Sequence, residues 1–216
     1  MNTASQIDTT VLIVGGGPVG MTMALCLAKR GIASYLVELR SAETLPDVKC
    51  NHISSRSMEL FRSLGVSQDL RAAGLPDDYP HDVSYRTTTL GEEIARIHIP
   101  GRNTRLTDHS GPDGNWPTPE PPHRINQRYI EPILRRHVQK QTLITCLYRH
   151  QVLAFTQDKN QVTAQIQNLD QPDSQALTLS AAYMVGCDGG RSMVRKGIGA
   201  KLIGDEVVQR VQSTCI

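Results

Sequence analysis

The hydrophobic pattern of the first forty residues predicts two strands with a helix between them. Val11–Val14 is an uninterrupted apolar run, which is typical of a parallel strand buried on both faces. The helical stretch that follows runs to about Arg30 and ends at Gly31, a residue favoured just past helix C-termini. A second apolar strand is predicted at Tyr35–Leu39.

Apolar positions recur with helical spacing in three later segments. We expect helices at Ser54–Leu64, at Ser67–Ala73 and from about Gln127 onwards. In the last of these, Pro132 should lie near the first turn, because proline deeper in a helix clashes with the carbonyl four residues before it. Gln127 and Arg128 would then stand at the loop-to-helix entry, where side chains can reach a ligand.

Strand-forming residues begin a different region at Val83–Thr89, which we expect to be a strand outside the unit formed by the first forty residues. Ile94, Ile97 and Ile99 suggest a return strand. Residues 100–122 contain five prolines besides Pro100, and so long a loop is usually functional or disordered.

The C-terminal part of the chain predicts a further set of strands. An antiparallel meander is expected from three runs, which are Val152–Thr156, Val162–Ile166 and Ala176–Leu179. A buried strand from Tyr183 then leads into an Asp-Gly turn, and Ser192 is placed to cap a helix through about Lys196. We therefore predict one domain made of residues 1–77 and 123–204, and part of a β-rich domain made of residues 78–122 and 205–216.

The composition is typical of a soluble globular protein. A formal charge of +2 and 20% charged residues in 216 give no electrostatic case for nucleic acid or a membrane surface. The five cysteines are scattered without a C-x-x-C pair, as in reduced intracellular proteins, and the histidines show no metal-ligand spacing. We expect a cytoplasmic protein without a metal.

One segment, Val11–Ala28, is uncharged for 18 residues and approaches the length of a membrane span. Gly15–Pro18 would break such a helix in its middle. No Lys or Arg precedes Lys29, so a signal peptide would lack its basic n-region. We therefore expect no membrane association.

The loop after the first strand carries a dinucleotide-binding pattern. Gly15, Gly17 and Gly20 have the Gly-x-Gly-x-x-Gly spacing, and Pro18 suits the first turn of the helix. These glycines permit a tight turn, close approach of a phosphate and close helix–strand packing. Glu38 ends the second strand 18 residues beyond Gly20, where a carboxylate can accept the hydroxyls of an adenosine ribose.

Three motifs together give the chain a family resemblance. They are Gly15–Gly20 with Glu38, Asn51–Glu59 and Gly186–Ser192. In this order and spacing the chain resembles the class A flavoprotein monooxygenases, which are FAD-dependent aromatic hydroxylases of the p-hydroxybenzoate hydroxylase type. The run Trp116–Gln127 is similar to hydroxylases of phenols and polyketides. The resemblance implies an α/β fold: a Rossmann-like FAD-binding domain, with a parallel sheet, helices and a β-meander, plus part of a β-rich substrate domain.

The resemblance also implies which residues contact FAD. They are Gly15, Gly17, Pro18, Gly20, Glu38, Leu39, Arg40, Lys49, Gln127, Arg128, Asp188 and Gly189. Lys49 stands where the family often has arginine, and lysine lacks the planar fork for a bidentate phosphate contact. Asp188 has a plainer alternative as a turn residue or helix cap. No catalytic residue is identified.

The implied chemistry belongs mainly to the cofactor. In the family, NADPH or NADH reduces FAD, and the reduced flavin takes O₂ to a C4a-hydroperoxide. The distal oxygen then goes to an aromatic or polyketide-like substrate. A homodimer is possible for the full-length form.

The chain is shorter than members of this family, which leaves alternatives to this function. Family members continue for about as many residues again, and Gly204-Asp205 comes too early to be their later Gly-Asp motif. We therefore expect the N-terminal part of such an enzyme. The alternatives are a truncated, non-catalytic FAD-binding fragment, or another flavoprotein on the same fold, a halogenase or a reductase. The halogenase-type Trp-x-Trp-x-Ile signature is absent.

Overall fold

The computed structural model describes residues 7–46, 48–49, 51–108, 118–205 and 207–210. Two compact units are found, one of residues 1–45 and 134–216 and the other of residues 46–133. The domain division expected from sequence has other boundaries and stays a prediction. Trp116 and Pro117 of the run similar to phenol hydroxylases lie outside the described residues, as do residues 206 and 211–216 of the expected second domain.

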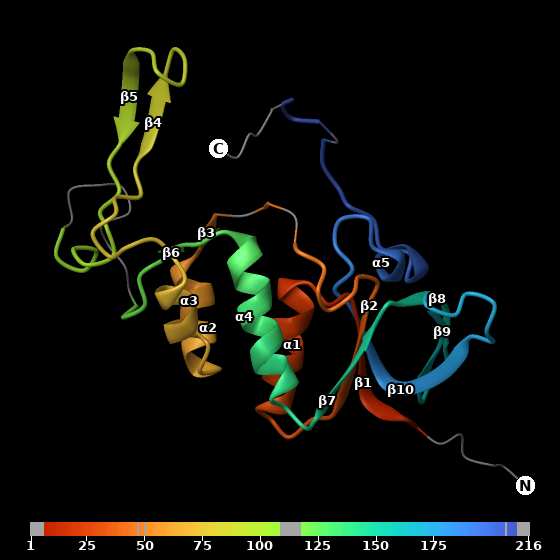
Figure 1. Ribbon diagram of the computed structural model, residues 1–216. Helices are drawn as coiled ribbons and strands as arrows, with labels where there is room; N and C mark the ends of the chain where they lie inside the picture. Colours follow the sequence, from red (N-terminus) through yellow and green to blue (C-terminus); the bar gives the residue numbers. More distant parts are fainter. Residues whose placement is uncertain (1–6, 47, 50, 109–117, 206, 211–216) are drawn as a thin grey trace, which may run out of the picture. The chain divides into compact units, whose positions relative to one another are not determined.

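The first unit is built on a six-stranded sheet (Figure 1). Its strands, in spatial order, are β7 (Ile144–Tyr148), β2 (Ser34–Glu38), β1 (Thr9–Val14), β10 (Leu177–Gly186), β9 (Val162–Asn168) and β8 (His150–Gln157). The first four are mutually parallel, and β9 and β8 continue the sheet antiparallel. The predicted parallel pair and the meander are therefore both present.

The core of this unit lies where the sheet is covered by its helices. Leu12 and Ile13 of β1 are fully buried, as expected for a central parallel strand. Helix α1 (Pro18–Ala28) packs against β1, β2 and β7, and its Met21 and Ala24 are buried. Helix α5 (Met193–Gly197) packs on β10, where Val194 joins the core.

Three features of the sheet differ from the prediction. The runs expected as separate strands, Ala176–Leu179 and the segment from Tyr183, form one continuous strand, β10, because its first half pairs with β9 and its second half with β1. Tyr183 is 67% exposed, so the second half is not buried as expected. Strand β7 was not predicted at all.

The second unit contains a small helical core. Helices α2 (Ser55–Ser63) and α3 (Ser67–Ala72) pack together, and Met58, Val66 and Leu70 are fully buried. The hydroxyl oxygen of Ser54 accepts a hydrogen bond from the Ser57 N–H and caps α2. Strands β3 (His52–Ile53) and β6 (His123–Arg124) form a short antiparallel pair.

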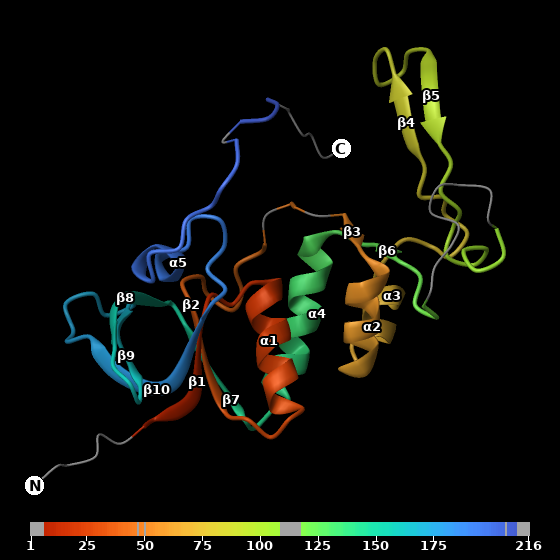
Figure 2. The ribbon, with the colours of Figure 1, turned by 180° about the vertical axis from the view of Figure 1, so that it is seen from behind.

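A separate hairpin belongs to the second unit. Strands β4 (Val83–Arg86) and β5 (Glu93–Ile97) pair antiparallel with an irregular register near Tyr85, and every residue in them is exposed. In Figures 1 and 2 the hairpin extends away from α2 and α3. The predicted strand and return strand are both present.

Helix α4 (Gln127–Gln139) crosses from the second unit into the first. The Asn126 side chain accepts a hydrogen bond from the Arg128 N–H at its start. Gln127 and Arg128 begin the helix as expected, but Pro132, expected near the first turn, is its sixth residue and lies inside the helix. The helix therefore lacks one backbone bond there, because proline has no N–H to donate to the carbonyl of Arg128. No helix in the described parts of the chain has the length and apolar character of a bilayer span.

Candidate dinucleotide site

The glycine-rich loop joins β1 to α1 at the carboxyl end of the parallel strands. Gly15 has a φ of +105°, which disfavours other residues, and a Cβ there would overlap the carbonyl group of Cys187. A Cβ at Gly20 would overlap the carbonyl oxygen of Gly15. Gly17 differs, because a Cβ there would meet nothing within 4 Å. Two glycines thus serve close packing, and the third borders open space.

The N-terminus of α1 has the features of an anion site. Gly17 is the N-cap and contributes no side-chain hydrogen bond, Pro18 occupies the first turn, and no acidic residue lies in that turn. Backbone N–H groups at a helix start that no side chain caps, together with the positive end of the helix dipole, favour a phosphate. The start of α1 therefore combines open space beside Gly17 with uncapped N–H groups, as an anion site requires.

Glu38 ends β2 beside the loop and is only 8% exposed. Its Oε2 accepts a hydrogen bond of 2.7 Å from the Gly16 N–H. Its Oε1 accepts bonds from the backbone N–H and the Nε of Arg40, at 2.9 and 3.0 Å. A carboxylate has about four acceptor positions, so one or more can still accept a ribose hydroxyl. The contact with Gly16 was not predicted, since it uses a backbone donor inside the motif.

The two residues after Glu38 differ in environment. Leu39 is 54% exposed, while the Arg40 side chain is held against Glu38 as an ion pair. Arg40 is thereby positioned next to the carboxylate expected to bind ribose. Both residues stay predicted cofactor contacts.

Asp188 and Gly189 follow β10 at the same end of the sheet. The Asp188 carboxylate accepts hydrogen bonds from the Ser192 hydroxyl and from the N–H groups of Met193 and Val194. Partial burial raises the pKa of Asp188, but these hydrogen bonds outweigh it, so the pKa lies below its ordinary value. Asp188 therefore acts as a cap at the start of α5, as the plainer alternative proposed, and its contact with FAD stays a prediction.

Lys49, Gln127 and Arg128 lie in the second unit. The Gln127 N–H donates to the Lys49 carbonyl at 3.3 Å, which places these two residues side by side. The Gln127 side chain donates to the buried carboxylate of Glu131 at 2.7 Å, whereas Arg128 is exposed. The Glu131 contact was not predicted, although Gln127 and Glu131 are four residues apart, a spacing that brings side chains together on a helix.

Most of the residues expected to contact FAD lie in the first unit. Its group comprises Gly15, Gly17, Pro18, Gly20, Glu38, Leu39, Arg40, Asp188 and Gly189. A parallel sheet, a glycine-rich turn at a helix start and an acidic residue ending the next strand define a dinucleotide-binding protein of the Rossmann type. Within the described residues, no cluster of His, Cys, Asp or Glu has the makings of a metal site.

Comparison with known proteins narrows this class. Residues 8–215 match the family described as FAD binding domain, and the chain belongs to this family. Phenol 2-monooxygenase of Pseudomonas sp. (strain EST1001) is 30% identical over 203 residues, which are 93% of this chain and 32% of that protein. Tetracenomycin A2 monooxygenase-dioxygenase of Streptomyces glaucescens is 30% identical over 223 residues, or 97% and 37%. The predicted resemblance to class A flavoprotein monooxygenases is confirmed.

Solved structures agree with the fold. The flavin-dependent monooxygenase PieE, in complex with FAD and substrate, matches with a TM-score of 0.80 and 29% identity, over 93% of this chain and 34% of that one. The rebeccamycin biosynthetic enzyme RebC with reduced flavin matches with a TM-score of 0.75 and 36% identity, over 89% and 34%. The α/β fold class is confirmed. The chain spans about a third of the length of the relatives it matches.

Proposed function

We propose that this chain is the FAD-binding part of a monooxygenase that hydroxylates an aromatic or polyketide-like substrate. The observation that carries the proposal is the glycine-rich loop, where Gly15 and Gly20 admit no Cβ, Gly17 faces open space, and Glu38 is bonded to Gly16. Family membership supports FAD as the dinucleotide, and the names of the relatives support the substrate class.

The residues present fit the adenosine diphosphate half of FAD. The N–H groups at the start of α1 would bind the pyrophosphate, and Glu38 would accept ribose hydroxyls while keeping its bonds to Gly16 and Arg40. When bound, the flavin supplies electron transfer and activation of O₂. The protein's part is to bind and orient it and to exclude water.

Several finer points of the proposal rest on the resemblance alone. They are the use of NADPH or NADH, the route of oxygen transfer, the contacts of Lys49, Gln127, Arg128, Asp188 and Gly189, a homodimer and a cytoplasmic location. We propose them for the full-length protein.

Titration of the purified chain with FAD, followed by visible absorbance, tests the cofactor assignment. We expect flavin bands that stay with the protein. Gly17→Val should abolish this binding while circular dichroism stays unchanged, because its side chain would enter the phosphate space and touch no protein atom within 4 Å at Cβ. Glu38→Ala should weaken it. A folded chain that does not bind FAD would contradict the proposal.

A second candidate function is FAD binding without hydroxylase activity, since the contacts seen at the glycine-rich loop account for binding alone. Adding NADPH anaerobically to the FAD-loaded chain separates the two. Bleaching of the flavin absorbance would support an active electron-transfer unit. Unchanged flavin bands would favour the fragment.

A further inference from the structure

We propose that Arg135 of α4 is a positioning residue for the adenosine half of the FAD site. The inference rests on the proposed function. It concerns the corner of the first unit beyond Glu38, where Arg135 and Tyr148 meet the turn after β2. No sequence motif marks either residue.

The strand register places this corner at the carboxyl end of the sheet. In the parallel pairing of β2 and β7, Glu38 is the direct partner of Tyr148, the last residue of β7. Direct partners on neighbouring strands carry their side chains on the same face. Tyr148 therefore stands next to the carboxylate proposed to bind the ribose.

Arg135 connects this strand end to the turn that holds Arg40. Its Nη1 donates a hydrogen bond to the carbonyl oxygen of Ala42. Its guanidinium carbon lies 5.9 Å from the centroid of the Tyr148 ring, within the range of a cation–π contact. Arg135 thus holds the turn after β2 through Ala42, while the Tyr148 ring packs against the Arg135 guanidinium.

Arg40, at the start of the same turn, is bonded to Glu38. Two N–H groups of Arg40 donate to Glu38 Oε1, and the Arg149 N–H donates to the carbonyl of Arg40 at 3.2 Å. The contacts therefore run from α4 through Ala42 and Arg40 to the carboxylate. Loss of the Arg135 contact would let the turn, and with it the orientation of Glu38, vary more.

The electrostatics of the corner suit this role. Burial raises the pKa of Tyr148 to about 12, and Cys146 adds to the rise. Burial likewise raises the pKa of the Cys146 thiol. Both groups are therefore neutral at physiological pH, so the Tyr148 ring beneath the Arg135 guanidinium carries no charge. The guanidinium keeps its attraction for the Ala42 carbonyl in a partly buried place, where such a bond is stronger than in water.

A comparison of FAD with FMN tests the inference, since FMN lacks the adenosine half. We expect Arg135→Met, which keeps the apolar stem but not the donor, to weaken FAD binding about tenfold, as for a hydrogen bond from a charged group. FMN affinity should stay at the wild-type value, so the ratio of the two dissociation constants changes. Arg135→Lys should recover much of the loss, because it retains one donor. Arg136→Ala, an exposed neighbour on α4, is the matched control and should change neither flavin.

Two failures can be told apart in this experiment. Equal loss of FAD and FMN affinity in Arg135→Met, or no loss at all, would overturn the positioning role while wild-type FAD binding kept the proposed function. A folded wild-type chain that binds neither FAD nor FMN would overturn both.

Discussion

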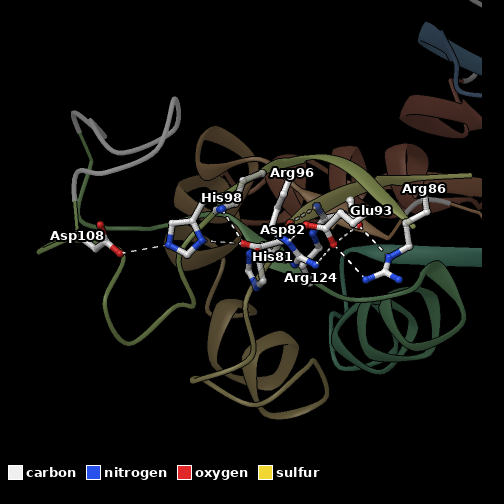
Figure 3. A network of polar contacts seen from close by, with 10 residues as sticks. His81, Asp82, Arg86, Glu93, Arg96, His98, Asp108 and Arg124 are labelled. Atoms are coloured by element: carbon white, nitrogen blue, oxygen red, sulfur yellow. Dashed lines mark hydrogen bonds and ion pairs between the residues drawn. The ribbon is translucent and has the colours of Figure 1, made fainter. Parts of the chain in front are cut away.

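The glycine-rich end of the first unit and the hairpin of the second use carboxylates in different ways. At the sheet end, Glu38 and Asp188 accept hydrogen bonds from backbone N–H groups of the loops beside them. On the exposed hairpin, Glu93 accepts hydrogen bonds from the side chains of Ser84, Arg86 and Arg96. Asp82, next to it, pairs with the side chains of Arg96 and His98 and also accepts one backbone bond, from the Ile99 N–H (Figure 3). A carboxylate that accepts from the main chain fixes the backbone around it, whereas an exposed ion pair fixes only two flexible side chains.

The difference separates a region whose carboxylates fix the backbone of neighbouring loops from a region held mainly through side chains. In Figure 3 the hairpin contacts form a line of side chains, with His98 lying between Asp82 and Asp108. The opposite face of the ribbon carries Val83 and Ile97, which are direct partners and each 37% exposed. A two-stranded ribbon of this kind is marginally stable by itself.

The largest expected effect comes from Gly20→Ala at the sheet end. The new Cβ would overlap the Gly15 carbonyl oxygen, which belongs to the backbone and cannot move aside. We expect a loss of about 3 kcal/mol in the free energy of unfolding, measured by urea denaturation followed by circular dichroism. Gly17→Ala is the matched control and should unfold at the wild-type midpoint, because its Cβ meets open space. Equal stability of the two variants would contradict the close packing at Gly20.

This contrast also explains what the sequence could predict. The loop and Glu38 were found because each requirement, a turn, a close approach or a strand end, is local and leaves a residue type at a fixed spacing. The corner at Arg135 was missed because its partner Ala42 lies 93 residues away, and such a contact leaves no pattern in either segment. Strand β7 was missed for the same reason, since its partner β2 is distant in sequence. Pro132 was misplaced because the helix tolerates one missing bond in its second turn.

The second largest effect is expected from two buried histidines, His81 and His123, whose protonation should destabilise the second unit at low pH. Burial, with the neighbouring charge of Arg124, lowers the pKa of His81 to about 4, and burial with the charges of Arg71 and Arg102 lowers that of His123 to about 4. Because both values lie below the ordinary value of 6.5, the unfolded chain takes up protons first as the pH falls. The contribution of these neutral histidines to the free energy of unfolding is therefore complete above pH 6.5 and is lost between pH 6.5 and 4, by on the order of 3 kcal/mol per histidine.

Hydrogen exchange read by mass spectrometry checks this effect region by region. Amides of α2, α3 and β6 should lose protection between pH 6.5 and 4, after correction for the intrinsic exchange rate. His81→Gln, which cannot titrate, should reduce the loss. Equal pH dependence in this variant and the wild type would show that burial of His81 does not drive the acid sensitivity.

The smallest effect is expected on the hairpin, from Glu93→Gln. Hydrogen bonds from Arg96 and Ser84 lower the pKa of Glu93 to about 2, although the residue is exposed. Since the folded-state pKa is depressed, the contribution of this carboxylate is present above its ordinary range and is lost as the pH falls towards 2. We expect the variant to lose order in β4 and β5 only, with the unfolding midpoint of the chain unchanged, because exposed ion pairs stabilise little.

Amide chemical shifts of Ser84 and Arg96 measure that local order. In the wild type they should move towards random-coil values between pH 4.5 and 2, and in Glu93→Gln they should already lie closer to those values at pH 7. Glu92→Gln is the matched control, since Glu92 is the exposed residue immediately before β5. A fall in the global unfolding midpoint of Glu93→Gln would contradict the view that hairpin carboxylates act only locally, and would bring this ribbon closer in kind to the sheet end that holds Glu38.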